Sequence, residues 1–334
     1  MRFKEVIEYI RQRAELAAAL EVSGWPKPGN VHRTRNHVDS RFEHFLAGAI
    51  ALGSSIEAAA LRGVMAARGK INLSEIGVGR LIKMAVNYIL SSHNGGNTHL
   101  GVCLLFIPLS AAAAKTYVEE DSFTLESLRR NFDMIMRSTT PIDAIKVYEA
   151  IAIASSPDEL GSVNNGDAPD IYDIDAKGKI LDLKVTLFDA MEEASSYDNV
   201  ARELVTGMEI SFNTGFKELI STFNSTEDIN AAIVHTFLKI LSEFPDTFIA
   251  RKIGLKRTRN IRRAVELGIE DVRWISERAK RILELGGLMT NEGKAALWKL
   301  DEELLNLGKN YSPGTTADLT ASSIMIALLN GLKF

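Results

Sequence analysis

Three short segments place glycine or proline beside His, Asn and Asp, and each then runs into a helical pattern of apolar residues. They are residues 26–39, 95–101 and 312–318. A helix N-terminus exposes unpaired backbone N–H groups and a partial positive charge, and a preceding glycine lets a ligand approach the backbone. Each segment could therefore bind an anion, above all a phosphate. Three such segments, all rich in catalytic residue types, predict one composite pocket for a polyphosphate.

The first segment combines cations with carboxylates. Lys27 lies between two prolines, which keep the backbone stiff and extended, so Lys27 and Arg33 could clamp phosphates. Asp39 and Glu43 are four residues apart and share one helix face if the helix has begun by Asp39. Two carboxylates on one face could hold Mg²⁺ through water. The alternative is that both residues only cap the helix and its dipole.

The second segment offers a histidine at a helix start. Gly95 and Gly96 free the backbone just before Asn97, Thr98 and His99. Thr98 is suited to the N-cap, which places His99 in the first turn, where the helix dipole disfavours the protonated imidazole. His99 could then act as a neutral base or donate a hydrogen bond to a ligand. The alternative is a capping loop with a surface histidine.

The third segment and a basic cluster complete the candidates. Pro313 and Gly314 predict a turn, and Asp318 would lie in the first turn of the helix that follows. Asp318 could face a ligand or serve only in a capping box. Arg251 and Lys252 open a basic cluster and could reach a phosphate. The rest of that cluster is interpreted as a solvated helix face.

Composition restricts the class of protein. The chain has 334 residues, 46% of them hydrophobic, which is enough for a large core. A formal net charge of -4 gives no global attraction for nucleic acid. The single cysteine, Cys103, excludes an intramolecular disulfide and any cysteine-based zinc site. The sequence shows no signal peptide and no unbroken apolar run of about 18 residues, which predicts a cytoplasmic protein outside the membrane.

Helical periodicity dominates the sequence and predicts an all-α fold, a single large domain over residues 1–334. Residues 180–185 are the one plausible strand, and residues 155–179 form a long irregular stretch that we expect to be a mobile loop. Ser40-x-x-Glu43 and Thr315-x-x-Asp318 resemble capping boxes at two helix starts. The helical patterns cover residues 3–22, 40–68, 75–92, 98–117, 124–136, 141–155, 182–194, 198–222, 226–243, 258–267, 270–286, 290–306 and 315–331.

Several common enzyme signatures are absent from the sequence. It contains no His-Glu-x-x-His, no Walker A loop, no Gly-x-Ser-x-Gly and no Rossmann fingerprint. Metalloprotease, P-loop, α/β-hydrolase and dinucleotide oxidoreductase functions therefore lose their usual support.

Several groups of residues also match a known family in order and spacing. They are Glu21 with residues 26–31, His37-x-Asp39, Asn97-Thr98-His99-x-Gly101, Asp246-Thr247 with Arg251, and Ser312-Pro313-Gly314-x-x-Ala317-Asp318-Leu319. Over most of its length the chain resembles the triphosphoribosyl-dephospho-CoA synthase family, the ATP:dephospho-CoA triphosphoribosyltransferases. The resemblance implies transfer of triphosphoribose from ATP to the 2′-hydroxyl of 3′-dephospho-CoA, with release of adenine and with Mg²⁺ as the accompanying ion.

The resemblance and the residue chemistry together give a set of expected roles. Proton transfer and stabilisation of a cationic ribose call for carboxylates and neutral histidines, and triphosphate calls for cations. The expected catalytic residues are Asp39, His37, His99 and Asp318, and the expected metal ligands are Asp39, Glu43 and Asp318. The expected substrate-binding residues are Lys27, Gly29, Asn30, Arg33, Asn97, Thr98, Arg251, Ser312 and Gly314. The expected partners are ATP and dephospho-CoA or a related nucleotide, and a homo-oligomer is an open possibility.

Departures from the family keep two other functions open. Leu100 and Val38 stand where the family usually has lysine, and His32 stands where it often has aspartate. The loss of two lysines removes partners for phosphate. A different acceptor, either another nucleotide or water, would make the protein a nucleotide glycosyltransferase or glycohydrolase. The third possibility is a non-catalytic helical nucleotide-binding protein.

Overall fold

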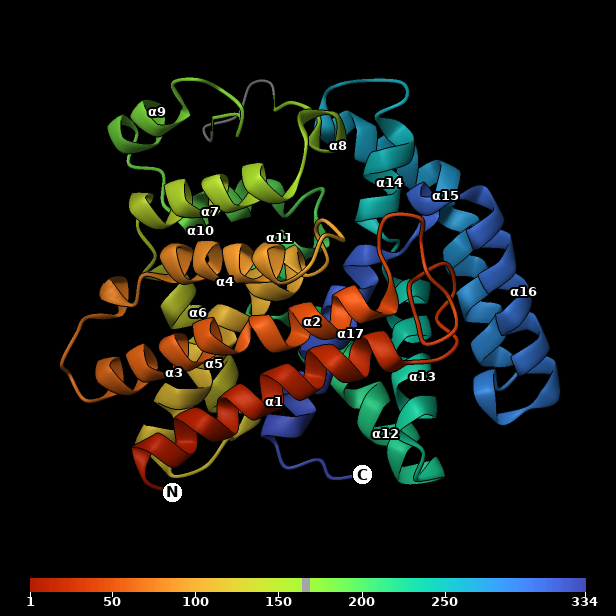
Figure 1. Cartoon of the computed structure of the whole chain (residues 1–334), viewed down its shortest axis with the longest axis horizontal. Coiled ribbons are helices and arrows are strands. Elements are labelled where there is room, and N and C mark those ends of the chain that lie inside the picture. Colours follow the sequence, from red (N-terminus) through yellow and green to blue (C-terminus); the bar gives the residue numbers. More distant parts are fainter. Residues whose placement is uncertain (164–168) are drawn as a thin grey trace.

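The computed structural model describes residues 1–163 and 169–334 and is built from helices. The described residues contain no β-strand, only isolated bridges such as the pair His32 and Arg35. The all-α prediction is confirmed, and the chain folds as one body of packed helices (Figure 1).

The helices follow one another closely along the chain. In order they are α1 (Phe3–Ser23), α2 (Phe42–Ala51), α3 (Gly53–Ala67), η1 (Leu73–Glu75), α4 (Val78–Ser92), α5 (Leu100–Glu120), α6 (Leu125–Arg137), α7 (Pro141–Ala154), α8 (Pro157–Leu160), α9 (Ala176–Asp182), α10 (Leu187–Ala194), α11 (Asn199–Thr206), η2 (Ser211–Gly215), α12 (Phe216–Thr226), α13 (Ile229–Glu243), α14 (Thr247–Gly254), α15 (Ile261–Glu284), η3 (Gly287–Met289), α16 (Asn291–Leu307), η4 (Lys309–Tyr311) and α17 (Gly314–Leu329).

Two helices form the centre of the larger core. Every residue of α5 from Val102 to Thr116 is buried, and so is every residue of α17 from Leu319 to Leu329. Both helices are apolar on all sides, and a helix of that kind is stable in water only when other helices surround it. The surrounding helices α1, α3, α6 and α11 supply that cover, with α1 running across the lower part of Figure 1.

A second, smaller core lies beside the first. It is formed by α13, α14, α15 and α16, which stand on the right of Figure 1. In α15 the buried residues Ala264, Gly268, Val272, Ile275 and Ala279 recur every three or four positions, so one face packs and the other stays in water. The N-terminal ends of α5, α11, α14 and α17 meet where the two cores adjoin, and this meeting point creates the cavity described below.

Some predicted boundaries were wrong. The pattern 40–68 is two helices, because Leu52 interrupts it, and α2 begins at Phe42 with Arg41 as its N-cap. The Nδ1 atom of His44 accepts a hydrogen bond from the Arg41 backbone at 3.1 Å, so the Ser40-x-x-Glu43 capping box does not form. The pattern 198–222 is divided by a π-helical turn, η2.

Two further expectations are corrected in the same way. The patterns 258–267 and 270–286 belong to one continuous helix, α15. The candidate strand 180–185 lies partly in α9, which ends at Asp182, and the chain then turns through Lys184 at a φ of 56°. A short apolar run cannot be assigned to a strand or a helix by periodicity alone, and here the packing of the run against its neighbours decides.

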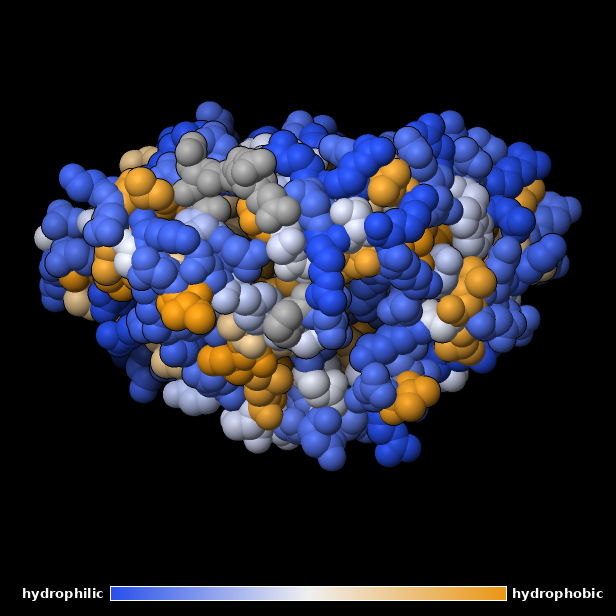
Figure 2. Space-filling model, turned by 90° about the horizontal axis from the view of Figure 1, so that it is seen from above, coloured by the Kyte–Doolittle hydropathy of each residue, from blue (hydrophilic) through white to orange (hydrophobic). Residues whose placement is uncertain are grey.

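Two helical stretches are long and apolar enough to cross a membrane, which corrects the expectation that no such run exists. They are Phe42–Ala67, which is 44% buried in its most apolar window, and Leu100–Glu120, which is 83% buried. The second is α5, whose burial is that of a core helix. Hydrophilic side chains cover most of the face shown in Figure 2, and the hydrophobic ones lie there in small separate groups.

The irregular stretch 155–179 is partly helical. Residues 164–168 lie outside the described part of the chain, and mobility of the stretch stays a prediction. On either side of them hydrogen bonds tie the backbone to the body of the protein. The Tyr148 hydroxyl donates to the Pro169 carbonyl at 3.1 Å, the Tyr172 hydroxyl donates to the Ser155 carbonyl at 2.7 Å, and the Ser162 N–H donates to the Arg259 carbonyl at 2.7 Å.

Candidate functional site

One cavity of about 570 Å³ contains residues from all three predicted segments. Asp39 comes from the first segment, His99 from the second and Asp318 from the third, and all three line this cavity. Its volume lies in the range expected for a small-molecule site. As predicted, residues of all three segments line one cavity.

The N-termini that meet at the cavity are already capped by the protein itself. The Asp198 carboxylate accepts hydrogen bonds from the first turn of α11, at Val200 and Ala201. The Asn97 side chain accepts one from Leu100 at the start of α5, at 3.0 Å. His99, not Thr98, is the N-cap residue of α5. These N–H groups are not available to a phosphate, which makes the side-chain cations of the cavity more important for binding an anion.

Asp246 joins two of these helices. Its buried carboxylate accepts hydrogen bonds from the backbone N–H groups of Phe248 and Ile249 at 3.0 Å, which caps α14. It also accepts hydrogen bonds from the Thr316 backbone and hydroxyl at 2.8 Å, which holds the start of α17. Burial raises the pKa of Asp246, and these hydrogen bonds oppose the rise. The Thr316 interaction replaces the capping box predicted between Thr315 and Asp318.

Asp318 lines the cavity, against the start of α5. The backbone N–H of Val102 favours the ionised form of its carboxyl group. A Cβ atom at Gly101 would lie 2.0 Å from its Oδ2 atom, so only glycine admits the carboxyl group there. Burial is the main cause that raises the pKa of Asp318 well above its usual range, and the carboxylate of Glu21 adds to it.

Lys27 is placed differently from the prediction. Its side chain is fully buried, forms an ion pair with Glu21 and lies over the Phe237 ring at 5.8 Å. Lys27 does not line the cavity, whereas Glu21 does. Burial lowers the pKa of Lys27 and raises the pKa of Glu21, and the ion pair opposes both shifts. The two prolines fix Lys27 inward, behind the carboxylates, and not outward toward a phosphate.

Three cations line the same cavity and form what we call the cationic corner. They are Arg251 and Lys252 from α14 and Lys309 from η4. Lys309 pairs with Asp39 at 2.7 Å, and Arg251 lies 3.8 Å from the Asp198 carboxylate. Burial, Lys309 and Arg251 together lower the pKa of Lys252 to about 8. The positive charges of Lys309 and Arg251 disfavour the protonated form of Lys252, and a bound anion would relieve that repulsion.

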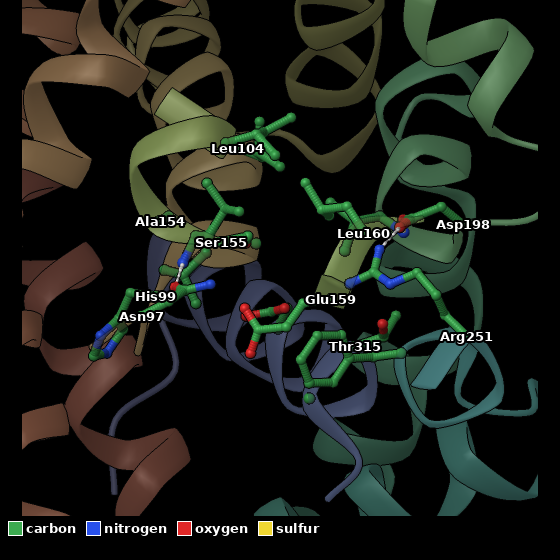
Figure 3. Close-up of a pocket in the computed structure, with 18 of the residues that line it drawn as sticks. Asn97, His99, Leu104, Ala154, Ser155, Glu159, Leu160, Asp198, Arg251 and Thr315 are labelled. Atoms are coloured by element: carbon green, nitrogen blue, oxygen red, sulfur yellow. Dashed lines mark hydrogen bonds and ion pairs between the residues drawn. The ribbon is translucent and has the colours of Figure 1, made fainter. Parts of the chain in front are cut away.

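Arg251 has spare hydrogen-bonding capacity. Within the described residues its buried Nε atom has no hydrogen-bond partner. Figure 3 shows Arg251 and its ion pair with Asp198 on one side of the cavity, Asn97 and His99 on the other side, and Glu159 between them. An unpaired buried donor is costly to a folded protein, and a bound anion would satisfy it.

Burial acts on both candidate histidines. Burial lowers the pKa of His99 to about 3, and its Nδ1 atom lies 2.8 Å from the Thr98 hydroxyl. A Cβ atom at Gly48 would lie 2.6 Å from that Nδ1 atom. Burial also lowers the pKa of His37, which lines the cavity. The Nε2 atom of His37 is buried and has no partner among the described residues.

The remaining predicted residues divide into two groups. Asn30, Asn97, Thr98, Ser312 and Gly314 line the cavity, and the Asn30 amide donates to the Pro313 carbonyl at 3.0 Å, which links the first segment to the third. Gly29 lies behind the wall, where its N–H donates to the Asp301 carboxylate at 3.1 Å.

Arg33 and Glu43 lie outside the cavity. Arg33 is exposed and donates to the Ser23 carbonyl at 2.6 Å and to Asn230 at 2.9 Å. Glu43 is exposed on the first turn of α2. The described residues contain no group of three or more His, Cys, Asp or Glu side chains that could hold a metal ion. The expected metal set of Asp39, Glu43 and Asp318 is therefore not assembled by the protein.

Sequence reasoning missed Lys309 and an aromatic end of the cavity. Lys309 precedes the third segment by three residues, so its proximity to Ser312 was the available signal. Tyr148, Tyr172 and Tyr197 also line the cavity, together with apolar residues of α7 and α10, and we call this part of its wall the aromatic end. Their positions in the sequence are far apart, and no local pattern joins them. Their flat, partly apolar surfaces fit a base or another uncharged part of a ligand.

Comparison with known proteins agrees with this site. The family model described as CitG, ATP:dephospho-CoA triphosphoribosyl transferase, matches residues 7–333. A crystal structure from Archaeoglobus fulgidus, named as a triphosphoribosyl-dephospho-CoA synthase, is similar with a TM-score of 0.55 and 27% sequence identity. That similarity covers 84% of this chain and 99% of the other.

Curated relatives match over a shorter stretch. Proteins of Salmonella gallinarum and Salmonella typhimurium, both named probable 2-(5″-triphosphoribosyl)-3′-dephosphocoenzyme-A synthase, are 27% identical over 117 residues. The match covers 34% of this chain and only 33% of the length of each relative.

Proposed function

We propose, because this chain belongs to the ATP:dephospho-CoA triphosphoribosyl transferase family, that it transfers triphosphoribose from ATP to the 2′-hydroxyl of dephospho-CoA and releases adenine. The observation that carries the proposal is that one cavity is lined both by the three cations of the cationic corner and by the carboxyl groups of Glu21 and Asp318, which we call the carboxylate end. The donor needs both. Its triphosphate carries several negative charges, and its ribose becomes cationic as the bond to adenine breaks.

The cationic corner binds the triphosphate in this proposal. Arg251, Lys252 and Lys309 bring three cations, and Asp39 and Asp198 pair with only two of them. Phosphate oxygens can accept hydrogen bonds from the buried Nε atom of Arg251 and can displace Asp39 from Lys309. Within this corner Arg251 is more enclosed than Lys309, and attraction at an enclosed charge is screened less by salt than at an open surface.

The carboxylate end then receives the ribose. Asp318 and Glu21 both line this part of the cavity, so a positive charge that develops at C1′ has acidic groups nearby. His37 offers the buried Nε2 atom as a hydrogen-bond partner for a substrate hydroxyl. With a pKa of about 3, His99 is neutral but a poor proton acceptor, so we assign it to hydrogen bonding and not to the role of the base.

The aromatic end is the proposed place for an uncharged part of either substrate. Tyr148, Tyr172 and Tyr197 present ring surface, and Met191 and Leu160 add apolar contact. The adenine ring and the pantetheine arm of dephospho-CoA are both of suitable chemistry. Photocrosslinking with 8-azido-ATP separates them. Labelling at these tyrosines that excess dephospho-CoA leaves unchanged assigns the end to the adenine of ATP, and labelling that is absent there or is abolished by dephospho-CoA assigns the end to the acceptor.

Magnesium remains a proposed companion of the triphosphate. The described side chains do not form a cluster that fits a protein-held ion. Mg²⁺ commonly keeps several waters and binds through substrate phosphates with one or two carboxylates. Asp39 is the carboxylate that best meets this need for a ligand beside the phosphates, because it lines the cavity next to Lys309. Location in the cytoplasm, a homo-oligomeric state and the absence of nucleic-acid and membrane partners likewise stay predictions.

Adenine release tests the proposal directly. The protein is incubated with ATP and Mg²⁺, with and without dephospho-CoA, and free adenine is measured by chromatography. Release that requires dephospho-CoA, with a product heavier by one triphosphoribosyl group, supports the transferase. Release without an acceptor supports a glycohydrolase. Binding of ATP with no adenine released under either condition supports the non-catalytic alternative and overturns the proposal.

A further inference from the structure

An aromatic side chain of α14 lies against two of the three cations of the cationic corner. Phe248 lines the cavity, and Arg251 and Lys252 follow it by three and four residues, so one turn of the helix brings both cations to its ring. The Nζ atom of Lys252 lies 3.8 Å from the centre of the ring, and the Cζ atom of Arg251 lies 5.1 Å from it. Both distances are below the limit of about 6 Å for a cation–π interaction, so the ring attracts both charges.

The position of this ring is fixed by two neighbouring segments. The Phe248 N–H donates to the Asp246 carboxylate at 3.0 Å, which holds the residue at the start of α14. The ring also packs against Gly314 at the start of α17, where an added Cβ atom would lie 3.0 Å from its Cδ1 atom. The sequence suggested that Gly314 leaves room for a ligand. In the structure, the room that its missing side chain leaves faces the ring.

The ring holds a cation without cancelling its charge. Lys309 is held by the Asp39 carboxylate at 2.7 Å, so a ligand anion has to displace a charged competitor there. Lys252 lies over the ring and, within the described residues, forms no ion pair with a carboxylate. The face of an aromatic ring attracts an ammonium group through its quadrupole but carries no net charge. The ring therefore leaves the positive charge of Lys252 uncancelled.

Cations that are already ordered bind an anion better than mobile ones. Lysine and arginine side chains have many rotamers, and ordering them on binding costs conformational entropy. Contact with the ring orders both side chains in the free protein. Arg251 also has a buried Nε atom with no hydrogen-bond partner among the described residues, and both cations line the cavity. The two charges are thus held at the cavity wall before a ligand arrives.

We propose that Phe248 is a positioning residue for the triphosphate of the donor, and that its ring holds Arg251 and Lys252 at the cavity wall for the phosphate oxygens. This inference rests on the proposed function, because it assigns the ring to the phosphates of ATP. It goes further by dividing the cationic corner into two parts. The part on the ring is prepared in the free protein, whereas Lys309 has to exchange Asp39 for the ligand.

The test weakens the attraction of the ring for cations and keeps its shape. Phe248 is replaced by 3,4,5-trifluorophenylalanine in the full-length protein by stop-codon suppression, because fluorine withdraws electron density from the ring face. The matched control is the same replacement of Phe244, whose ring centre lies 5.5 Å from the Cζ atom of Arg202 and which does not line the cavity. Isothermal titration calorimetry measures the binding of two probes, ATP and inorganic triphosphate, and circular dichroism checks the fold.

We expect the fluorinated ring at position 248 to weaken both probes by the same factor, about fivefold, because the ring acts through the cations that bind phosphate. Phe248→Leu, which has no ring, should weaken both by about tenfold, and Phe248→Tyr, which keeps an electron-rich ring, should bind like the wild type. The control at Phe244 should leave both affinities unchanged. Unchanged affinities in the fluorinated and Leu variants would overturn the inference. A loss confined to ATP would also overturn it and would assign the ring to the adenine.

The reaction rate gives a second readout, which a general loss of structure would not reproduce. At saturating ATP and dephospho-CoA, the protein with the fluorinated ring should release adenine within about twofold of the wild-type rate, because the ring acts on binding. A loss of rate with unchanged affinity would overturn the inference. A wild-type protein that binds both probes but releases no adenine would reject the proposed transferase alone, and the variants would still confirm or overturn the role of Phe248. A wild-type protein that binds neither probe would overturn both.

Discussion

The cationic corner and the carboxylate end line one cavity, but their charged side chains are paired in different ways. At the cationic corner, Lys309 and Arg251 pair with carboxylates of neighbouring segments at 2.7 and 3.8 Å, and Lys252 is left beside both. At the carboxylate end, the cation Lys27 is fully buried and the acidic groups face the cavity. At the cationic corner the cations outnumber the carboxylates that pair with them, so a ligand anion can bind there. At the carboxylate end, Glu21 is already paired with the buried Lys27.

This difference separates binding from chemistry. A ligand anion can exchange with the carboxylates of the cationic corner, so changes there should alter affinity. The ion pair behind the carboxylate end has no ligand to exchange with, so changes there should alter the free energy of unfolding. The predictions below test that separation, from the largest expected effect to the smallest.

The largest effect is expected from Lys27→Met. Removal of one partner from a buried ion pair usually costs about 3–5 kcal/mol of the free energy of unfolding. Urea unfolding followed by circular dichroism measures the loss. The double variant with Glu21→Gln should recover part of it, because no unpaired charge then remains. A single variant as stable as the wild type would show that the pair is not important to the fold.

The second largest effect is expected when either lysine of the cationic corner is replaced. The substitutions Lys252→Met and Lys309→Met should each weaken ATP binding about tenfold, or about 1.4 kcal/mol, because each removes one cation that would bind a phosphate. Isothermal titration calorimetry gives the affinity, and Lys256→Met, an exposed lysine of the same basic cluster outside the cavity, is the matched control. If the control weakens binding as much as the cavity variants, the attraction is a general surface effect.

A pH dependence of binding follows from Lys252. Its pKa is lowered to about 8, and only its protonated form attracts phosphate. ATP affinity should therefore be full below pH 8 and fall as the pH rises above it, by about tenfold in total, the loss expected for Lys252→Met. Lys252→Arg, which stays charged, should flatten the curve. The same fall in that variant would assign the titration to another group.

The smallest effects are expected outside the cavity. Arg33→Ala and Glu43→Gln change residues that were predicted to bind phosphate and metal, but both are exposed and do not line the cavity. We expect ATP affinity and adenine-release rate to stay within twofold of the wild type, because surface changes of this kind usually have small effects. A tenfold loss in either would show that the first segment reaches the substrate after all.

The fold and the composite nature of the site could be predicted from the sequence, because both depend on patterns. Helical periodicity indicates helices wherever they occur, and glycine or proline beside polar residues marks helix starts such as those of α5 and α17. Asp39, His99 and Asp318 were found in this way. Their meeting in one cavity was inferred from the charge that a polyphosphate requires.

The direction of individual side chains could not be predicted. The local sequence pattern of a lysine between two prolines is the same whether the side chain points to water or, like that of Lys27, to a buried glutamate. Lys309 and Tyr172 are brought to the cavity by long-range packing, which leaves no local signal. The extra cations that bind phosphate in this proposal lie on α14 and η4, and the two missing lysines at Val38 and Leu100 therefore do not leave the cavity without positive charge.

The most direct test is a comparison of the two ends in one experiment. ATP affinity and single-turnover adenine release with saturating dephospho-CoA are measured for the double variant Lys252→Met with Lys309→Met and for Asp318→Asn. We predict that the first loses about 100-fold in affinity and less than tenfold in the rate at saturating ATP. The second should keep its affinity and lose about 10²–10⁴-fold in rate. Equal losses of affinity and rate in both variants would contradict the division of the cavity into a binding end and a chemical end.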